Sequence, residues 1–272
     1  MNSGLKPYGC MLKKNNKIRN LHYLKLFLLF LIAFFVFEDC LTEQVEFFIG
    51  DVTYIGVPVA SANIRLESQQ NFLKIIAKTK TIGVMNTIFH INNSYISTCD
   101  TDFVSFRYEK NIEQSNLSER KLIQLNSGKE YIKFSDLLSR NSVLTEIDTT
   151  VQNEYYDLFS LIFKIRQLGK GDYHFIVAAN YDLWQVDIKY IKTDMLKLSR
   201  EKLNCKKFRL KFKKIYDNPL ESPTDVLTNN LFNERSEFFV WISADNRNLP
   251  VKFYFDKFPF GATFSLKDFW QQ

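Results

Sequence analysis

Apolar and polar residues alternate along most of the chain after residue 44, in short runs separated by residues that favour turns. Alternation with a period of two places successive side chains on opposite faces of a sheet, so each run predicts a strand with one buried face. In the first half, the predicted strands are 45–54, 59–67, 72–79, 87–93, 102–109, 121–124 and 129–134. Turn-like sequences such as Asn92-Asn93-Ser94 follow these runs, which predicts an antiparallel meander.

One segment, 155–168, has helical rather than alternating spacing. Phe159, Ile162, Phe163 and Arg166 recur at intervals of three or four residues, and Gly169 follows as a helix stop. Because apolar residues cover most of this helix, we predict that it fills the concave side of the sheet.

Predicted strands then resume at 173–179, 185–193, 206–216, 237–243, 251–255 and 262–266. The stretches 140–153 and 218–234 are rich in Ser, Asn or Pro and predict loops. These elements favour a mainly β fold, in which one strongly curved antiparallel sheet, open or half-barrel, wraps around one α-helix. A closed barrel is the alternative.

The segment 238–255 predicts a β-hairpin, because two aromatic and β-branched runs flank a polar turn. Asp245, Asn246 and Asn248 tolerate turn backbone and hydrogen-bond their own main chain. Pro250 has no N–H, so it should begin the return strand or lie on a sheet edge.

The sequence from Trp241 to Lys252 resembles the C-terminal signature of a family of bacterial exported proteins, the domain of unknown function 3108. The segment 157–166, with an acidic start, a serine and a closing arginine, is similar to that family's short helix. The segment 54–66 is similar to its glycine-centred opening hairpin, and the resemblance spans roughly residues 45–268. The signature residues in this chain are Gly56, Asp157, Arg166, Trp241, Asp245, Arg247 and Pro250. A more distant likeness, of shape alone, is to the lipoprotein-sorting carriers of the Gram-negative envelope.

Residues 1–40 read as an export leader, in which a basic segment precedes the apolar run 26–37. That run is short for a membrane-spanning helix, yet no small-residue cleavage pattern follows it, so a cleaved signal peptide and a retained inner-membrane anchor both remain open. Either way, we expect residues 41–272 to form a single periplasmic domain. Lipidation of Cys40 is disfavoured because Phe37, Glu38 and Asp39 precede it. Either Met1 or Met11 could be the start.

The chain carries 36 Lys and Arg against 30 Asp and Glu, a net charge of +6. Six of the basic residues and two of the acids lie in residues 1–40, which leaves 30 against 28 in the exported part. A nearly balanced surface argues against nucleic-acid binding. Cys99 and Cys205 could form a disulfide or lie separately in the core.

The sequence shows no catalytic constellation. It has no Gly-x-Ser-x-Gly elbow, and the exported part holds only His90 and His174, without metal-ligand spacing. Gly169-Lys-Gly171 lacks the rest of a phosphate-binding loop. We therefore expect no catalytic residue, no metal and no cofactor.

Two charged features call for an explanation. Arg166 lies on an apolar helix and needs a carboxylate or several carbonyl partners, for which Asp245 and Asp182 are candidates. In 206–214, alternation places Phe208, Leu210 and Phe212 on one face and a basic stripe on the other. The stripe consists of Lys207, Arg209, Lys211 and Lys213. It is either a solvated sheet face or a contact for anionic lipid or acidic polymer.

Three functional hypotheses follow. The first is a non-catalytic envelope protein that binds an apolar ligand, such as a lipid, or an envelope partner. The second is a structural or assembly factor that docks on another envelope protein. The third is a hydrolase, which would require His90 or His174 to meet a Ser and a carboxylate. An open apolar groove favours the first, and a groove filled by Phe159, Ile162 and Phe163 favours the second.

Overall fold

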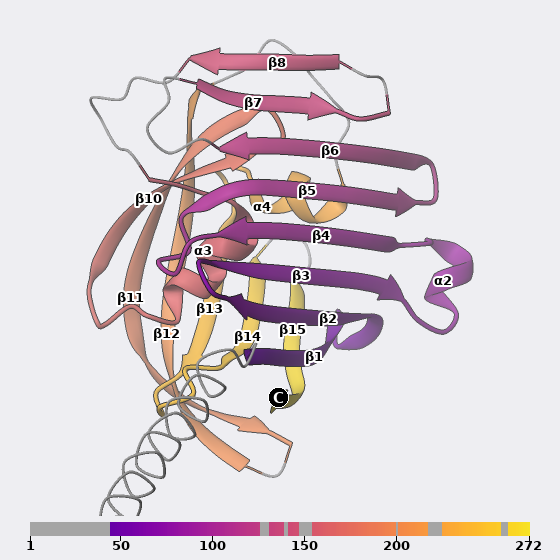
Figure 1. Ribbon diagram of the computed structural model, residues 1–272. Helices are drawn as coiled ribbons and strands as arrows, with labels where there is room; N and C mark the ends of the chain where they lie inside the picture. Colours follow the sequence, from indigo (N-terminus) through magenta and orange to yellow (C-terminus); the bar gives the residue numbers. More distant parts are fainter. Residues whose placement is uncertain are drawn as a thin grey trace, which may run out of the picture. The chain divides into compact units, whose positions relative to one another are not determined.

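The computed structural model describes residues 44–125, 131–138, 141–146, 154–199, 201–216, 225–256 and 261–272. Residues 44–272 form one compact unit. Within the described residues, this unit contains a single sheet of fifteen strands whose first and last members do not pair, so the sheet is open (Figure 1). The predicted mainly β fold with a curved antiparallel sheet is therefore confirmed. The leader, including 26–37 and Cys40, lies outside the described residues.

The first half of the sheet is the predicted meander, in which each strand pairs antiparallel with the next. Its strands are β1 (Gln44–Tyr54), β2 (Val57–Gln69), β3 (Phe72–Thr81), β4 (Asn92–Cys99), β5 (Ser105–Gln114), β6 (Leu117–Leu125), β7 (Tyr131–Asp136) and β8 (Asn141–Glu146).

The second half starts at the opposite edge of the sheet and returns to its middle, where β15 pairs antiparallel with β1. Its strands are β9 (Tyr155–Tyr156), β10 (Asp172–Ala179), β11 (Asp182–Leu198), β12 (Glu201–Tyr216), β13 (Glu237–Ser243), β14 (Pro250–Asp256) and β15 (Ala262–Gln271). The chain therefore builds outward from β1, crosses over, and builds back toward β1.

The joint between β1 and β15 contains a bend. The register between them shifts at Ile49 and Gly50, and a Cβ added to Gly50 would lie 2.4 Å from the ring of Phe264. Only glycine lets the two strands approach this closely, and such an irregularity increases the local twist of a sheet. Gly50 therefore contributes to the curvature that encloses the helix.

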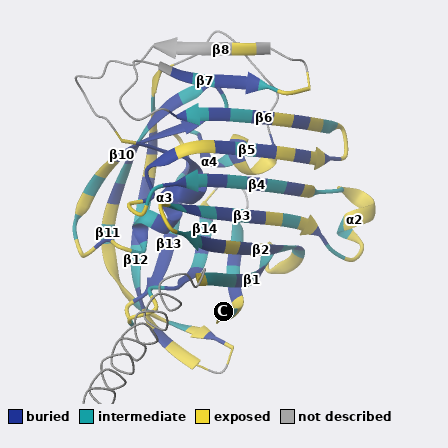
Figure 2. Cartoon of the chain, in the orientation of Figure 1, coloured by how far each residue is buried: buried dark blue, intermediate teal, exposed yellow. Residues whose placement is uncertain are grey.

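The helix α3 (Leu158–Ile165) fills the concave side of the sheet, as predicted. All of its side chains are buried except that of Lys164 (Figure 2). The ring of Phe159 packs 5.1 Å from that of Tyr95 on β4, and Phe163 packs 5.5 Å from Phe48 on β1. One helix thus supplies apolar contacts to strands far apart in the sheet.

A buried carboxylate begins this helix. Asp157 is the N-cap, and its Oδ1 accepts hydrogen bonds from the amides of Phe159 and Ser160 at 2.9 and 3.1 Å. Its Oδ2 accepts from the hydroxyls of Ser97 on β4 and Ser105 on β5, at 2.5 and 2.7 Å. Burial raises the pKa of Asp157, and these hydrogen bonds oppose the shift. The cap satisfies the helix start and also ties it to the meander.

Several predicted boundaries are wrong. The helix begins three residues later than predicted, because Tyr155 and Tyr156 pair with β10. The predicted strand 87–93 is replaced by α2 (Met85–Ile88) and a strand from residue 92, in which Asn93 points inward to Tyr95. The predicted loop 140–153 contains β8, and 218–234 contains α4 (Val226–Leu231).

The predicted hairpin is confirmed, and the cysteine alternatives are resolved. The hairpin forms between β13 and β14, and Pro250 begins the return strand. Cys99 and Cys205 are separate, fully buried thiols, so the disulfide is absent. No helix in the described part of the chain is both long and apolar enough to span a membrane.

The Asp157 cap generates a prediction about helix docking. Asp157→Ala should lower the free energy of unfolding by about 3–5 kcal/mol, because it leaves two helix amides and two core hydroxyls without their acceptor. Asp157→Asn should stay within about 1 kcal/mol of wild type at pH 7, since an amide oxygen can accept from the backbone while the serine hydroxyls turn to accept from its NH2. Urea unfolding measures both, and an Asn variant as unstable as the Ala variant would show that the negative charge itself is required.

Candidate functional site

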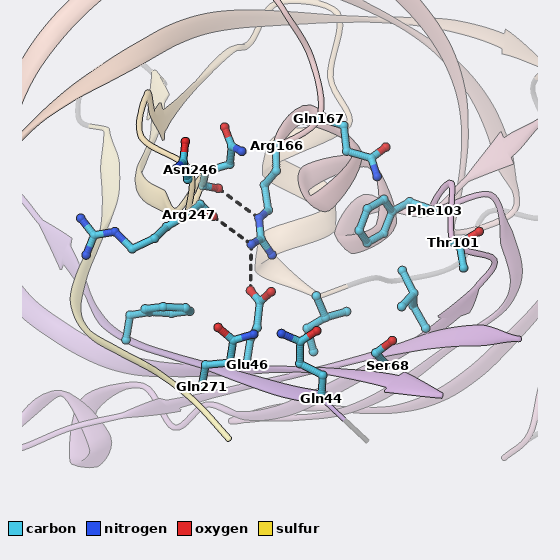
Figure 3. A pocket seen from close by; sticks show the side chains of 14 residues that line it. Gln44, Glu46, Ser68, Thr101, Phe103, Arg166, Gln167, Asn246, Arg247 and Gln271 are labelled. Atoms are coloured by element: carbon cyan, nitrogen blue, oxygen red, sulfur yellow. Dashed lines mark hydrogen bonds and ion pairs between the residues drawn. The ribbon is translucent and has the colours of Figure 1, made fainter. Parts of the chain in front are cut away.

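A pocket of about 500 Å³ opens at the end of the sheet near the last turn of α3 (Figure 3). We call it the mouth pocket. Its walls come from the start of β1 and β3, the end of β2 and β15, the β4–β5 connection, the helix end and the β13–β14 turn. The residues that line it are Gln44, Glu46, Leu66, Ser68, Leu73, Thr101, Phe103, Arg166, Gln167, Asn246, Arg247, Asn248, Phe269 and Gln271.

Arg166 lies at the centre of this pocket. It is the C-cap of α3, and its side chain is 12% exposed. Its Nη2 lies 2.8 Å from Oε2 of Glu46, while Nε and Nη2 donate to the carbonyls of Asn248 and Arg247 at 3.0 and 3.2 Å (Figure 3). The guanidinium also lies 5.4 Å from the ring of Phe48. Arg166 therefore joins the helix end to β1 and to the β13–β14 turn.

The predicted need of Arg166 for a carboxylate and carbonyls is met, but both candidate carboxylates are wrong. Asp182 pairs with Lys214 on the neighbouring strand, and Asp245 pairs with Arg247. The actual partner, Glu46, lies on β1. The sequence pattern could not place β1 beside the end of the helix, because this position depends on the pairing of β1 with β15, the first and last strands. Asp157 begins the helix and Arg166 ends it, as the family resemblance implied.

The β13–β14 turn is itself ordered by charge. Arg247 donates to Oδ2 of Asp245 through Nε and Nη2, at 2.9 and 2.6 Å, and reaches Glu201 at 2.9 Å. Although burial opposes it, hydrogen bonds from Arg247 and Ser243 hold the pKa of Asp245 below its usual value. The turn therefore presents its carbonyls to Arg166 in a fixed position.

Amide side chains dominate the polar wall of the mouth pocket: Gln44, Gln167, Asn246, Asn248 and Gln271. Each amide can both donate and accept hydrogen bonds, and the arginines here already have carboxylate partners. Such a wall suits a neutral polar chain with alternating donors and acceptors. The rings of Phe103 and Phe269 add apolar surface.

The basic stripe lies on the outer face of the sheet, opposite the buried Phe208, Leu210 and Phe212. Its charges have partners there. Lys211 lies 3.0 Å and Arg209 3.7 Å from Glu237 on β13, and the Lys207 ammonium is 4.7 Å from the ring centre of Trp241. Lys213 is exposed on the same face. The predicted alternation is confirmed, and Glu237 offsets part of the positive charge of the stripe.

Trp241 and Gly56 have structural positions. The indole of Trp241 lies on the outer face between Lys207 and Lys252 and donates to Asp194 at 3.0 Å. Gly56, with φ of 75°, completes the β1–β2 turn. Neither residue lines the mouth pocket, so the signature residues gather there only from the helix end and the β13–β14 turn.

A second polar cluster was not predicted from the sequence. It lies on the concave side of the sheet, between β5, β6 and the start of α4. Lys110 on β5 lies 2.7 Å from Asp225 and 2.9 Å from Glu119, and Lys121 lies 3.2 Å from Glu119. All four side chains are at most 4% exposed. A signal was available: Lys110 falls between Tyr108 and Ile112 in the inward phase of an alternating strand.

This cluster holds α4 against the sheet. Asp225 caps α4 by accepting from the amide and hydroxyl of Thr228, and it accepts from the hydroxyl of Tyr95 at 2.9 Å. Although burial opposes it, the charge and hydrogen bond of Lys110 lower the pKa of Asp225 to about 2. Burial lowers the pKa of Lys121, against the charge of Glu119. The three ion pairs compensate charges that would be prohibitive alone.

The two histidines do not meet in a cleft. His174 is 69% exposed on β10 and lies 2.7 Å from Asp187. His90 hydrogen-bonds Asn86, and its amide donates to Ser115 at the far end of β3 and β4. Neither residue lines the mouth pocket.

Comparison with known proteins gives a family and a fold. Residues 50–267 match the model of a family described as a protein of unknown function, DUF3108. A β-barrel-like protein of the domain of unknown function DUF1849 from Brucella abortus is similar in structure, with a TM-score of 0.52 and 8% identity over 85% of this chain and 98% of that one. A putative exported protein with a YmcC-like fold from Bacteroides fragilis aligns with a TM-score of 0.32 and 7% identity over 85% and 96%. No curated protein matches the sequence.

The Arg166 contacts generate a stability prediction. Arg166→Ala should lower the free energy of unfolding by about 2–3 kcal/mol, because Glu46 loses its ion-pair partner and two turn carbonyls lose their hydrogen-bond donor. Arg166→Lys should lose about half of that, since an ammonium cannot replace the planar fork. Arg209→Ala, which removes a surface pair, should change it by less than about 0.5 kcal/mol. Urea denaturation compares the three, and an unchanged Arg166→Ala protein would refute the role of this pair.

The Lys110–Asp225 pair generates a pH prediction. An unfolded Asp has a pKa of about 3.9, so a folded pKa of about 2 contributes stability that is present above pH ~5 and is lost as the pH falls toward 2. The gap in unfolding free energy between wild type and Asp225→Asn should therefore narrow by about 1 kcal/mol between pH 7 and pH 3. The pKa of Asp157 is raised rather than lowered, but Asp157 is present in both wild type and Asp225→Asn, so its effect cancels in the difference.

Asp172→Asn, at an exposed position that begins β10, is the matched control and should follow wild type at every pH. A gap between wild type and Asp225→Asn that stays constant from pH 7 to pH 3 would contradict the depressed pKa.

Proposed function

The chain belongs to the DUF3108 family of proteins of unknown function, and from this premise we propose that it is an exported, non-catalytic protein of the Gram-negative envelope that docks a partner protein at the mouth pocket. The family match covers residues 50–267, which is almost all of the part after the predicted leader. The leader supports export, as either a cleaved signal peptide or an anchor.

The observation that carries the proposal is the filled concave side of the sheet. Phe159, Ile162 and Phe163 are at most 6% exposed and belong to the hydrophobic core, where Phe159 packs on Tyr95 and Phe163 on Phe48. An apolar ligand bound on this face would have to displace the helix and the hydrogen bonds of Asp157. The assembly role is therefore favoured over the carrier role.

The chemistry of the mouth pocket supports a polypeptide as the partner. Backbone amides and carbonyls of an extended segment alternate as donors and acceptors, which side-chain amides on the pocket wall can match in pairs. The two aromatic rings in the wall would cover apolar side chains of such a segment. The local charges are balanced, so recognition would depend on hydrogen bonds more than on long-range attraction.

A site-specific cross-linker tests the proposal in cells. A photoreactive phenylalanine analogue at Ser68, on the pocket wall, should give one discrete adduct with an envelope protein. The same analogue at Asn111, exposed on β5, should give none, and at Lys213 it reports on the basic stripe. Asn246→Ala combined with Gln271→Ala should lower the Ser68 adduct, because these amides line the pocket.

The carrier role makes a different prediction for the same protein. Native mass spectrometry with lipid extraction, on full-length chain expressed with its leader and purified from the envelope, should give a bare protein mass if docking is the function. A reproducible lipid mass, together with no adduct from Ser68, would overturn the docking proposal in favour of the carrier.

A further inference from the structure

The β1–β2 turn and the α2 segment lie at the end of the sheet opposite the mouth pocket and are largely exposed (Figures 1 and 2). We call their exposed apolar side chains the apolar rim. The β1–β2 turn supplies Tyr54, Ile55 and Val57, and the segment around α2 supplies Val84, Ile88 and Phe89. These six are exposed by between 36% and 76%. Sixteen large hydrophobic side chains are exposed in the described residues, so two short segments hold more than a third of them.

The two segments of the apolar rim are neighbours. Ala60 pairs with Thr81 at the ends of β2 and β3, and the amide of Ile82 donates to the carbonyl of Val59 at 3.1 Å. The β1–β2 turn and the α2 segment therefore project side by side from one end of the sheet. Because both project outward, the apolar rim is a protrusion.

Backbone conformation gives an independent reason to look for a function there. Ile55 has a φ of 52° and is followed by Gly56 with a φ of 75°, the pattern of a two-residue hairpin turn that favours Asn-Gly. A β-branched residue is strongly disfavoured in this conformation. The side chain of Ile55 is 59% exposed, so packing within the domain does not offset the strain. Folding alone would favour a different residue at the tip.

Charge identifies the kind of surface that fits. Neither 52–64 nor 81–99 contains a single Asp, Glu, Lys or Arg. Two exposed cations, Lys78 and Lys80, lie behind the apolar rim on β3. An uncharged apolar tip with lysines set back from it matches the depth profile of a bilayer surface, where apolar groups enter the acyl boundary and cations meet anionic headgroups. A protruding apolar tip can bind either a lipid bilayer or a matching groove on another protein. The position of Lys78 and Lys80 behind the tip favours the bilayer.

We propose that the apolar rim inserts into the surface of a lipid bilayer, with Lys78 and Lys80 beside the headgroups. This goes beyond the proposed function, because it concerns the opposite end of the sheet and does not require a partner at the mouth pocket. The insertion leaves the mouth pocket directed away from the membrane, since the two sites lie at opposite ends of β1, β2 and β3.

Photolabelling from the lipid phase tests the insertion. The full-length chain is bound to vesicles of phosphatidylethanolamine and phosphatidylglycerol that contain a phospholipid with a diazirine in its acyl chain, and adducts are mapped by mass spectrometry. Wild type should be labelled in peptides that hold 54–57 and 84–89. Any adduct in 26–37, where the leader is retained, serves as an internal reference.

Ile55→Asn combined with Val84→Asn should reduce labelling of the apolar rim about tenfold or more, because it replaces two apolar side chains that would insert into the lipid with polar ones. The matched control is Met195→Asn, a 66% exposed apolar residue on the β11–β12 hairpin, which should leave labelling unchanged. Ile55→Asn alone should also unfold at an equal or higher urea concentration than wild type, since Asn tolerates positive φ.

Two results would overturn the proposal. One is labelling of wild type that is absent from 54–57 and 84–89, which would leave a groove on a partner protein as the occupant. The other is labelling of the apolar rim that the double variant does not reduce. Loss of the Ser68 cross-link in cells would count against the proposed function alone, because it does not depend on lipid labelling.

Discussion

The fold depends on how one helix, α3, is held on the concave side of the sheet. The hydrogen bonds of Asp157 hold its first turn against β4 and β5, and the contacts of Arg166 hold its last residue against β1 and the β13–β14 turn. The first anchor joins the helix to two strands of the first half, and the second joins it to β1 and to a turn of the second half. Between them, the aromatic side chains of the helix can fill the interior in only one orientation, because apolar packing is non-directional and hydrogen bonds are not.

Burial of polar groups follows two different solutions in this protein. Asp157 is satisfied by neutral donors, so its carboxylate is surrounded by hydrogen bonds without a counter-charge nearby. Lys110, Lys121, Glu119 and Asp225 instead form a connected cluster of opposite charges. The directional hydrogen bonds of Asp157 orient α3, whereas the ion pair between Lys110 and Asp225 holds the short helix α4. Both are costly when incomplete, which makes register errors in β4, β5 or β6 unfavourable.

Local pattern was sufficient for much of this architecture. Alternation predicted the meander, the inward face of 206–214 and the hairpin before Pro250, because each depends on neighbouring residues. Helical spacing predicted the helix but not its start, since Tyr155 and Tyr156 gain a strand pairing that only the tertiary fold provides. The partner of Arg166 could not be inferred, because Glu46 is brought to it by the pairing of β1 with β15. Lys110 was missed for a simpler reason: the predicted strand ended at residue 109, so the inward position of Lys110 was not recognised.

The pairing of β1 with β15 also determines when the domain can be completed. These are the first and last strands of the domain, yet they lie in the middle of the sheet, and they pair from Glu46 with Gln271 to Tyr54 with Ala262. As the chain is synthesised, β1 to β8 can form early, but one edge of β1 has no neighbour until the ten residues of β15 are available. Contacts of this sequence separation form slowly, and an unpaired edge is open to association with other chains during that time. A chain that ends before residue 262 therefore lacks the strand that joins the two halves of the sheet. This truncation should cost far more stability than removal of a strand at the edge of the sheet.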